Sequence, residues 1–489
     1  MTGSERPTAT YFWHDYETFG SDPRRDKPAQ FAGIRTDEDF NIIGEPLVRY
    51  CQPPAEMLGH PEATLVTGIT PQYAMQNGVP ESQFIADIEA EMATPGTCSV
   101  GYNNLQFDDE VTRHALWRNF FDPYAREWQN QCSRWDIIDM ARLAYALRPD
   151  GIEWPTRDDG APSFKLEDLA VANNLGRGSA HDALSDVYAT IDLARLIRAK
   201  QPRLFDFVRS NRDKKTARKL LNMDTRKPTL HVSSKFGASN GCLSPVMPIA
   251  PHPTNRNCLI VYDLRVDPEP LLTLDAESIR ERMFTPRKDL PEDAPRVALK
   301  GVYLNKCPVL APFEMLRPPE AERLAIDVDM CRAYWKAIHD NMAAVATKAT
   351  EVFDRGPGLE PAADPEHGLY DGLIGDADRE RAAQVRAGST KFFSNNQLVF
   401  DDDRLNTLFF RYRARYYPES LSLEEDRQWR EWQANELAYA PSGGLTLDEY
   451  DEIVAALMSR VRGQPKQLQR LLDLKAWADQ RRALVSELV

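Results

Sequence analysis

The segment Tyr11-Phe-Trp-His-Asp-Tyr-Glu17 is short and rich in aromatic residues, as β-strands commonly are. Within it Asp15 and Glu17 are two positions apart, so a strand would present both carboxylates on one face. Two carboxylates held so close repel each other, and one of them tends to keep its proton. A divalent cation removes that repulsion, and an all-oxygen ligand set favours Mg²⁺ or Mn²⁺ over zinc. Taken alone, the pattern also fits a solvated strand end.

Two further segments carry carboxylates at positions where they could join this pair. Asp108 follows an expected strand and begins an expected helix, so it either caps that helix or belongs to the site. In His181-Asp-Ala-Leu-Ser-Asp186 the outer residues are about 140° apart on an ideal helix. They share a site only if His181 lies in the preceding glycine-containing loop and Asp186 in the first turns of the helix. An isolated histidine there also fits a capping or core role.

The rest of the chain falls into regions with different patterns. Residues 11–199 alternate strand and helix patterns, which indicates one α/β domain. A small β domain is expected over 228–310, where short strands are interrupted by Pro and Gly. Beyond it, helical patterns cover 316–352 and most of the chain after a linker at 354–365. The individual elements expected are strands at 31–36, 98–102, 229–233, 258–262 and 297–304, and helices at 108–121 and 184–198.

Composition limits the class of protein. The 489 residues correspond to about three domains of about 150 residues each. With 42% hydrophobic and 27% charged residues, the chain is not disordered as a whole. The sequence contains no run of about 18 apolar residues, which a membrane-spanning helix would need. No signal peptide is visible either, so we expect a cytoplasmic protein. Seven scattered cysteines without a C-x-x-C pair favour free thiols over disulfides or a zinc site.

The net charge of −14 argues mildly against a protein that coats nucleic acid. Local patches rather than totals steer ligands, however. One basic excess exists between Lys200 and Lys227, with ten Lys or Arg and three Asp. It fits a solvated helix face or linker as well as a binding surface.

The order and spacing of the three carboxylate segments resemble the DEDDh branch of the DnaQ-like 3′→5′ exonucleases. Asp15 and Glu17 match its first motif, Asp108 the second, and His181 with Asp186 the third. Longer matches resemble the bacterial exodeoxyribonuclease I family, and they extend over essentially the whole chain. They are His-Asp-Tyr-Glu-Thr-Phe-Gly (14–20), Pro-Ala-Gln-Phe-Ala (28–32), Gly-Tyr-Asn-Asn-Leu-Gln-Phe-Asp-Asp-Glu-Val-Thr-Arg (101–113), Asp-Pro-Tyr (122–124), Ala-His-Asp-Ala (180–183), Gln-Pro-Arg-Leu-Phe-Asp (201–206), Leu-Asn-Lys-Cys-Pro-Val-Leu (304–310) and Leu-Tyr-Asp-Gly (369–372).

This resemblance implies an α/β fold in three parts. They are a ribonuclease H-like, DnaQ-type exonuclease domain over 1–200, an SH3-like β domain over 201–355, and a helical C-terminal domain over 356–489. The implied activity is 3′→5′ hydrolysis of single-stranded DNA to 5′-mononucleotides in DNA repair or recombination. The implied enclosing groove favours processive digestion.

The predicted chemistry uses two metal ions, which can stabilise both the attacking and the leaving oxygen of an in-line displacement. One Mg²⁺ would be held by Asp15, Glu17 and Asp186, with Mn²⁺ as an alternative ion. The other would share Asp15, with Asp108 acting directly or through water. His181 is the candidate base, since it is the group of suitable pKa in these motifs.

The resemblance also implies contacts with ligands. DNA contacts are expected from Phe19, Arg113, Tyr124, Trp128, Arg142 and Lys165, although core packing is an alternative for the three aromatic residues. The family binds the acidic C-terminal tail of single-stranded DNA-binding protein, for which Arg148, Lys227 and Arg317 could supply positive charge. A monomer is expected.

Three other interpretations remain open. An RNA-trimming exonuclease of the same branch would usually be near one domain long, and 2′-hydroxyl discrimination cannot be read from a sequence. A catalytically inactive DNA-binding adaptor is disfavoured because all four carboxylates and His181 are present. A polymerase proofreading domain lacks an accompanying polymerase-sized region.

Overall fold

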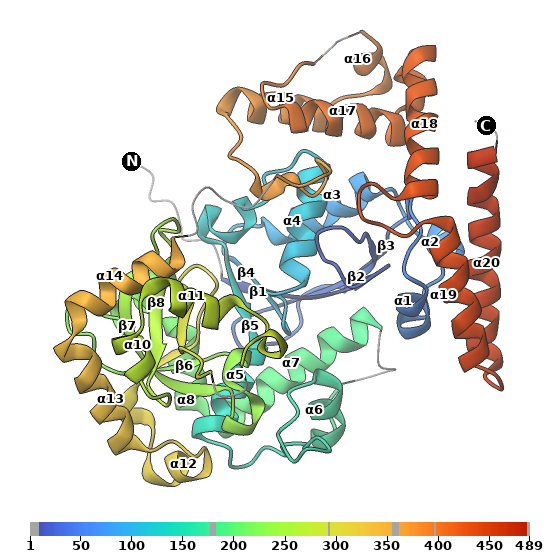
Figure 1. The fold of residues 1–489 in the computed structure, drawn as a ribbon. Coiled ribbons are helices and arrows are strands. Elements are labelled where there is room, and N and C mark those ends of the chain that lie inside the picture. The colour runs from blue at the N-terminus through green and yellow to red at the C-terminus, as the bar shows by residue number, and fades with distance from the viewer. Residues whose placement is uncertain (1–8, 177–181, 292–293, 355–360, 396–397, 487–489) are drawn as a thin grey trace, which may run out of the picture. The chain divides into compact units, whose positions relative to one another are not determined.

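The computed structural model describes residues 9–176, 182–291, 294–354, 361–395 and 398–486 (Figure 1). The chain forms two compact units. The first contains 1–134, 177–188 and 360–489, and the second contains 135–176 and 189–359. Strand β5 (Ser133–Asp136) and helix α7 (Ala183–Lys200) each begin in the first unit and continue into the second.

The first unit is built on a mixed sheet with the strand order β3-β2-β1-β4-β5. Strand β1 pairs antiparallel with β2 and parallel with β4, so it has a neighbour on both sides. Six of its nine residues are buried, including all four aromatic side chains and His14. The elements of this part are β1 (Thr10–Thr18), β2 (Pro28–Thr36), β3 (Leu47–Tyr50), α1 (Pro61–Thr67), α2 (Pro71–Asn77), α3 (Glu81–Met92), β4 (Thr97–Gly101) and α4 (Asp108–Arg118).

Helices α3 and α4 supply the apolar side chains that cover this sheet, including Phe84, Ile88 and Leu116. The expected helix over 108–121 ends at Arg118. The reason is local, because Phe120 takes a left-handed backbone conformation with a φ of 64°.

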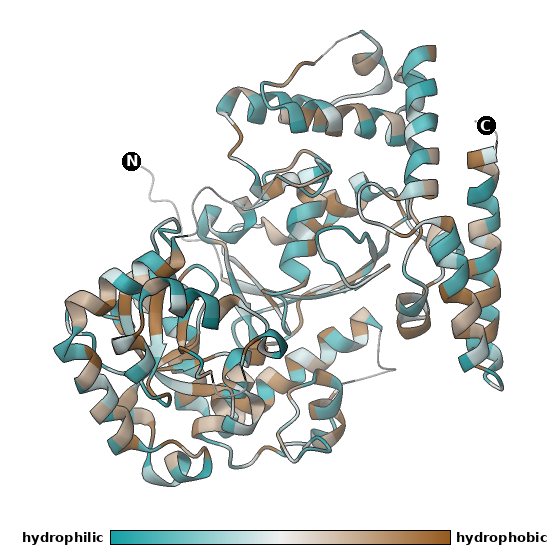
Figure 2. Cartoon of the chain, viewed as in Figure 1, coloured by the Kyte–Doolittle hydropathy of each residue, from teal (hydrophilic) through white to brown (hydrophobic). Residues whose placement is uncertain are grey.

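The C-terminal part of the first unit is helical, as predicted. Two of its helices begin with reciprocal capping boxes, Ser422 with Glu425 and Thr446 with Glu449. Figure 2 shows hydrophobic and hydrophilic residues intermixed along α19 and α20, as expected for helices with one buried side. The helices are α15 (Asp376–Arg386), α16 (Thr390–Asn395), α17 (Asp403–Tyr416), α18 (Leu423–Tyr439), α19 (Leu447–Arg460) and α20 (Pro465–Ser486).

Apolar cores join these helices to the N-terminal sheet region. Trp117 and Phe120 pack in one cluster with Leu369, Phe393 and Phe409. A second cluster joins Leu58 to residues of α18, α19 and α20. The C-terminal helices and the sheet region therefore share cores.

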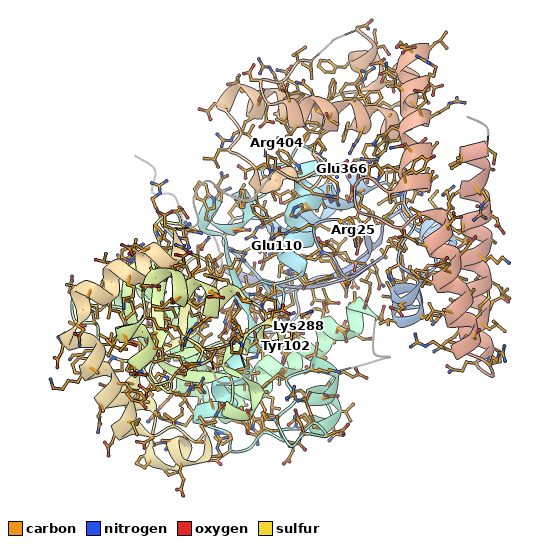
Figure 3. The ribbon with its side chains drawn as sticks, viewed as in Figure 1. Arg25, Tyr102, Glu110, Lys288, Glu366 and Arg404 are labelled. Carbon is orange, nitrogen blue, oxygen red and sulfur yellow. The ribbon has the colours of Figure 1, made fainter. Side chains whose placement is uncertain are left out.

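A buried ion cluster also joins the two parts. Glu366, labelled in Figure 3, accepts from Lys27 at 2.5 Å and from Arg415 at 2.5 Å. Arg415 also pairs with Glu56 at 2.7 Å, and Arg411 lies 3.3 Å from Glu366. Because buried charges are stable only when paired, these five side chains depend on one another.

The second unit contains an antiparallel sheet with the order β10-β6-β7-β8-β9. Val246, Val261 and Val302 from three of its strands pack into one core with Ala217 and Leu221. The predicted small β domain is thus confirmed, although its first helices precede the sheet. The strands are β6 (Thr229–Val232), β7 (Leu243–Pro251), β8 (Cys258–Asp263), β9 (Leu299–Tyr303) and β10 (Leu310–Pro312).

The helical stretch expected over 316–352 consists of three helices. The first break contains Ala325, which has a left-handed φ of 52°. Asp327 then caps the next helix by accepting the Met330 backbone N–H. The helices of this unit are α5 (Ile137–Leu147), α6 (Leu166–Asn173), the remainder of α7, α8 (Pro202–Asn211), α9 (Lys214–Leu220), α10 (Glu269–Thr273), α11 (Ala276–Phe284), α12 (Pro318–Arg323), α13 (Val328–Asp340) and α14 (Met342–Phe353).

All seven cysteines are free, and six of them are buried. Within the described ranges, no helix combines the length and the apolarity that crossing a membrane requires.

Candidate active site

Strand β1 carries two of the predicted metal ligands near its C-terminal end. Side chains alternate along the strand, so Asp15 and Glu17 emerge on one face while Tyr16 between them packs into the core. Both residues are of intermediate exposure. Glu17 lies opposite Gln30 of β2, and the strand register shifts immediately after this pair.

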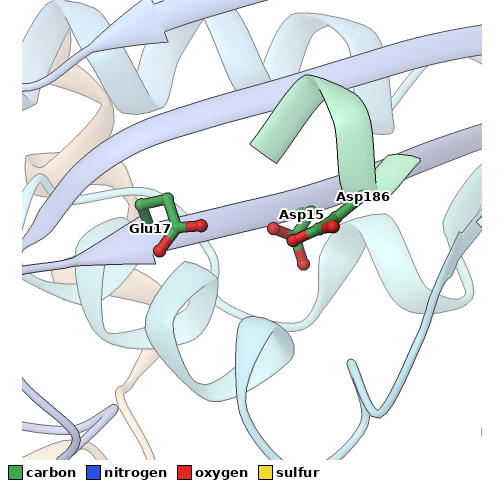
Figure 4. Close-up of side chains that lie close together, drawn as sticks. All are labelled: Asp15, Glu17 and Asp186. Atoms are coloured by element: carbon green, nitrogen blue, oxygen red, sulfur yellow. The ribbon is translucent and has the colours of Figure 1, made fainter. Parts of the chain in front are cut away.

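Helix α7 brings the third carboxylate to the same place. Asp186 lies in the first turn of α7, as the sequence predicted. One carboxylate oxygen from each of Asp15, Glu17 and Asp186 can be chosen so that all lie within 4.8 Å of one another (Figure 4). Three oxygen ligands so arranged suit a divalent cation.

Asp108 is tied to the strand that carries the first two ligands. Asp108 is the first residue of α4, so the N-cap position belongs to Phe107. Asp108 is only 4% exposed. Its Oδ1 accepts the backbone N–H of Tyr16 at 3.1 Å, between the two strand ligands. This bond places the carboxyl group of Asp108 beside Asp15 and Glu17. Its position therefore agrees with a role in the site and not with helix capping alone.

The cluster is strongly electronegative. Burial, followed by the charges of Asp108, Asp186, Glu17 and Asp182, holds the pKa of Asp15 well above its usual range. Burial and the charges of Asp186 and Asp182 raise the pKa of Glu17 to about 7. A bound cation would stabilise the ionised form of these carboxylates, because its positive charge removes their mutual repulsion. The residues thus fit a bound divalent cation.

Sequence reasoning missed two polar residues beside this cluster. Asp182 adds a fifth acidic side chain, and the Gln30 amide donates to its Oδ1 at 3.1 Å. Asp182 stands in the quoted segment 181–186, so its acidity was visible there. Gln30 offered no signal beyond its place in a strand, because its partners Asp182 and Ala183 are 152 and 153 positions away in sequence.

A cavity of about 430 Å³ opens beside Glu17. That volume is in the range of small-molecule sites. Its walls combine the end of β1 with the first helix and one aromatic residue before α4. They are formed by Tyr16, Glu17, Thr18, Gly20, Ser21, His60, Glu62, Ala63, Val66, Thr67 and Phe107.

The structure describes only the second of two further predicted site residues, His181 and Phe19. His181 lies outside the described residues. Phe19 is only 2% exposed and packs with Ala29, Ile69 and Ala74, so it presents no ring face to a nucleotide here. The core-packing alternative matches this geometry.

Among the predicted DNA contacts of the first unit, Trp128 is 66% exposed and Tyr124 is partly buried. Arg113 is only 4% exposed, because Glu110 at 2.6 Å and Glu127 at 2.7 Å both accept from its guanidinium. That guanidinium lies 5.6 Å from the ring centroid of Tyr124. Arg113 thus lies against the Tyr124 ring and helps to hold it in place. Glu110 and Glu127 balance the charge of Arg113 within the protein.

Of the two predicted DNA contacts in the second unit, Arg142 and Lys165, the first lies near an aromatic ring. Arg142 pairs with Asp139 at 2.7 Å and stands 5.9 Å from the ring centroid of Phe164. Lys165 follows that phenylalanine and is exposed.

The predicted partner-binding arginines meet at one carboxylate. Arg317 pairs with Glu320 at 2.8 Å, and Arg148 lies 3.7 Å from the same carboxyl group. The Arg317 side chain is about half exposed, and Lys227 is exposed.

Comparison with known protein families matches three models along the chain. Residues 12–194 match the exonuclease model, residues 212–355 the exonuclease I SH3-like domain, and residues 363–481 the exonuclease I C-terminal domain. Exodeoxyribonuclease I of Escherichia coli is 46% identical over 431 residues, which is 88% of this chain and 90% of the relative.

The chain belongs to the exodeoxyribonuclease I family. Two solved structures are similar throughout. Exonuclease I from Methylocaldum szegediense is 48% identical, with a TM-score of 0.92 over 98% of this chain and 100% of that one. Exonuclease I of E. coli in complex with a dA16 oligonucleotide is 42% identical, with a TM-score of 0.93 over 97% and 100%.

The predicted family and fold class are thereby confirmed. The chain is an enzyme of the exonuclease class, and its exonuclease domain together with the acidic cluster implies the use of a divalent metal ion.

Proposed function

We propose that this chain hydrolyses single-stranded DNA from the 3′ end and releases 5′-mononucleotides, with Mg²⁺ as the ion and Mn²⁺ as an alternative. One observation carries the proposal. Three carboxylates of an exonuclease-family domain offer oxygens that lie within 4.8 Å of one another. The E. coli relative has been solved with a DNA oligonucleotide, and also as a zinc-bound complex with single-stranded DNA.

The residues divide into metal-holding and proton-handling groups. Asp15, Glu17 and Asp186 would hold one ion, and Asp15 with Asp108, directly or through water, would hold the second. Bound there, two ions would stabilise the attacking and leaving oxygens of an in-line displacement. His181 would accept the proton of the attacking water. The cavity beside Glu17 is the place for the terminal nucleotide.

The test is digestion of end-labelled strands of DNA and RNA, with Mg²⁺ or with EDTA. Wild-type protein should shorten DNA from its 3′ end only with metal, and Asp186→Ala should abolish cleavage. Asp192→Ala is the matched control, because Asp192 lies on the same helix but pairs with Arg195 at 2.9 Å. Preferential RNA digestion would favour an RNA-trimming enzyme, and DNA binding without cleavage would favour an inactive adaptor.

Calorimetry tests the role of Asp186 as a metal ligand, and a second variant tests the role of His181 as the base. Asp186→Ala should lose Mg²⁺ or Mn²⁺ binding, and undiminished binding would count against its ligand role. His181→Ala should lower turnover far more than DNA affinity. A His181→Ala variant with normal turnover would remove that residue from the mechanism.

We also propose that Arg148, Lys227 and Arg317 bind the acidic tail of single-stranded DNA-binding protein. A similar exonuclease I has been solved with that protein and an inhibitor. Arg317→Glu should weaken binding of an acidic tail peptide in fluorescence anisotropy, whereas Arg332→Glu, an exposed arginine on α13, should not. Equal loss in both variants would indicate a general charge effect.

The remaining proposals concern organisation. Three domains over 1–200, 201–355 and 356–489 are supported by the matched ranges of the family models. A monomer in the cytoplasm stays our prediction, and sedimentation velocity at two concentrations would test the first part.

A further inference from the structure

Gln30 is a buried polar residue of β2 that faces the candidate metal site. It is 2% exposed, and it stands directly opposite Glu17 in the pairing of β1 with β2. Burying an amide is unfavourable unless its donor and acceptor are both hydrogen-bonded. Its partners therefore show what the residue does.

Those partners lie chiefly at the start of α7. The Gln30 Nε2 donates to Asp182 Oδ1 at 3.1 Å and to the Tyr50 hydroxyl at 3.2 Å. Its Oε1 accepts the backbone N–H of Ala183, the first residue of α7, at 3.4 Å. The N–H groups of a first helical turn have no partner within the helix, so Gln30 satisfies one of them. An amide side chain can donate and accept at the same time without carrying charge.

Asp182 transmits this fixation to the helix that carries Asp186. Its Oδ2 accepts from the Ser185 backbone N–H at 3.4 Å and from the Ser185 hydroxyl at 3.2 Å. Its carbonyl oxygen accepts the Asp186 backbone N–H at 3.1 Å. The amide of Gln30 thus links the strand that pairs with the Glu17 strand to the helical turn that carries Asp186.

We propose that Gln30 is a positioning residue that sets the separation between the strand carboxylates, Asp15 and Glu17, and the helix carboxylate, Asp186. This inference rests on the proposed metal-dependent function. Residues that hold metal ligands in place commonly contribute about 10–100-fold to metal affinity or activity. Gln30 contacts neither substrate nor metal in this scheme, so it acts only through the ligands.

The first test compares Gln30→Leu with Gln52→Leu in the full-length protein. Leucine removes both hydrogen-bonding groups of Gln30 at similar size. Gln52 is the matched control, because its amide donates to the carbonyls of Met75 and Gly78, away from α7. Mn²⁺ binding is measured without DNA by electron paramagnetic resonance, alongside kcat and KM for an oligonucleotide at several Mn²⁺ concentrations.

We expect Gln30→Leu to bind Mn²⁺ about 10–100-fold more weakly, and its kcat to recover as Mn²⁺ is raised, with little change in KM for DNA. Gln52→Leu should match wild type. Wild-type Mn²⁺ affinity in Gln30→Leu would overturn the inference. Absence of Mn²⁺ binding in the wild-type protein would instead overturn the proposed function, so the two failures are distinguishable.

A rescue experiment covers the case in which Gln30→Leu fails to fold. Gln30→Glu keeps the acceptor for Ala183 but sets a carboxylate against Asp182, and we expect weak Mn²⁺ binding. Adding Asp182→Asn reverses donor and acceptor while the net charge of the cluster stays the same. The double variant should recover most of the affinity. A double variant no better than Gln30→Glu would overturn the inference.

Discussion

Replacing Glu17 by glutamine is expected to stabilise the metal-free protein above pH 7 and to remove its stabilisation by metal. The reason is that burial, together with the charges of Asp186 and Asp182, opposes the ionisation of Glu17. Glutamine keeps the size and carries no charge. The carboxylate is therefore a ligand that the fold holds at a cost in stability.

The magnitude follows from the pKa. Burial and neighbouring charge raise the pKa of Glu17 from its usual 4.5 to about 7. At about 1.4 kcal/mol per pKa unit, this corresponds to at most about 3–4 kcal/mol, and to less because Glu17 is partly exposed. The folded state holds the proton more tightly than the unfolded state, so stability is lost as pH rises from 4.5 to 7. The full loss is present above pH 7.

The assay is thermal unfolding at one scan rate, from pH 5 to pH 8, with EDTA or with Mn²⁺. In EDTA at pH 8 the Tm of Glu17→Gln should exceed that of wild type by several degrees, and the difference should shrink toward pH 5. With Mn²⁺ the order should reverse. Because the ligand must be ionised, Mn²⁺ affinity of the wild type should fall as pH drops below 7.

Glu62→Gln is the control for this experiment, because Glu62 lines the same cavity but is largely exposed. It should leave both Tm values unchanged. A Tm for Glu17→Gln at or below that of wild type, in EDTA at pH 8, would refute the reasoning.

Three further predictions concern DNA binding and stability. Trp128→Ala should weaken binding of a short single strand by about 1–3 kcal/mol in fluorescence anisotropy with EDTA, and an unchanged Kd would place Trp128 outside the DNA path. Glu366→Ala should lower the free energy of unfolding in urea by about 3–5 kcal/mol, because buried cations lose their shared acceptor, whereas Glu424→Ala on the surface of α18 should have little effect. Arg113→Lys cannot pair with both of its carboxylates and should loosen Tyr124, which raises KM for DNA more than it lowers kcat. Equal kinetics for Arg113→Lys would count against the bracing role.

The carboxylate site was the most predictable part of the molecule. Alternation along a strand places Asp15 and Glu17 on one face whatever the rest of the fold does. Asp186 lies in the first turn of α7. The placement of the strand pair and that of Asp186 are both local consequences of backbone geometry. Asp108 was ambiguous, because a carboxylate at a helix start also fits a cap, and only the bond from Tyr16 distinguishes the two.

Burial could not be predicted so well, because it depends on partners distant in sequence. Arg113 looked like a phosphate contact, but Glu127 occupies its guanidinium. Phe19 sits beside the ligands in sequence, yet its ring packs into a core completed by Ile69 and Ala74. Short motifs identify which residues meet at a site and leave open which of them remain accessible.

The ion cluster around Glu366 limits how far this protein can be reduced. A nuclease cut down to its N-terminal sheet would keep Lys27 but lose Glu366, and would uncover Trp117 and Phe120. Such a fragment would carry an orphaned charge and a bare apolar patch. Shuffling of the catalytic portion into other chains is therefore disfavoured unless the helical portion travels with it.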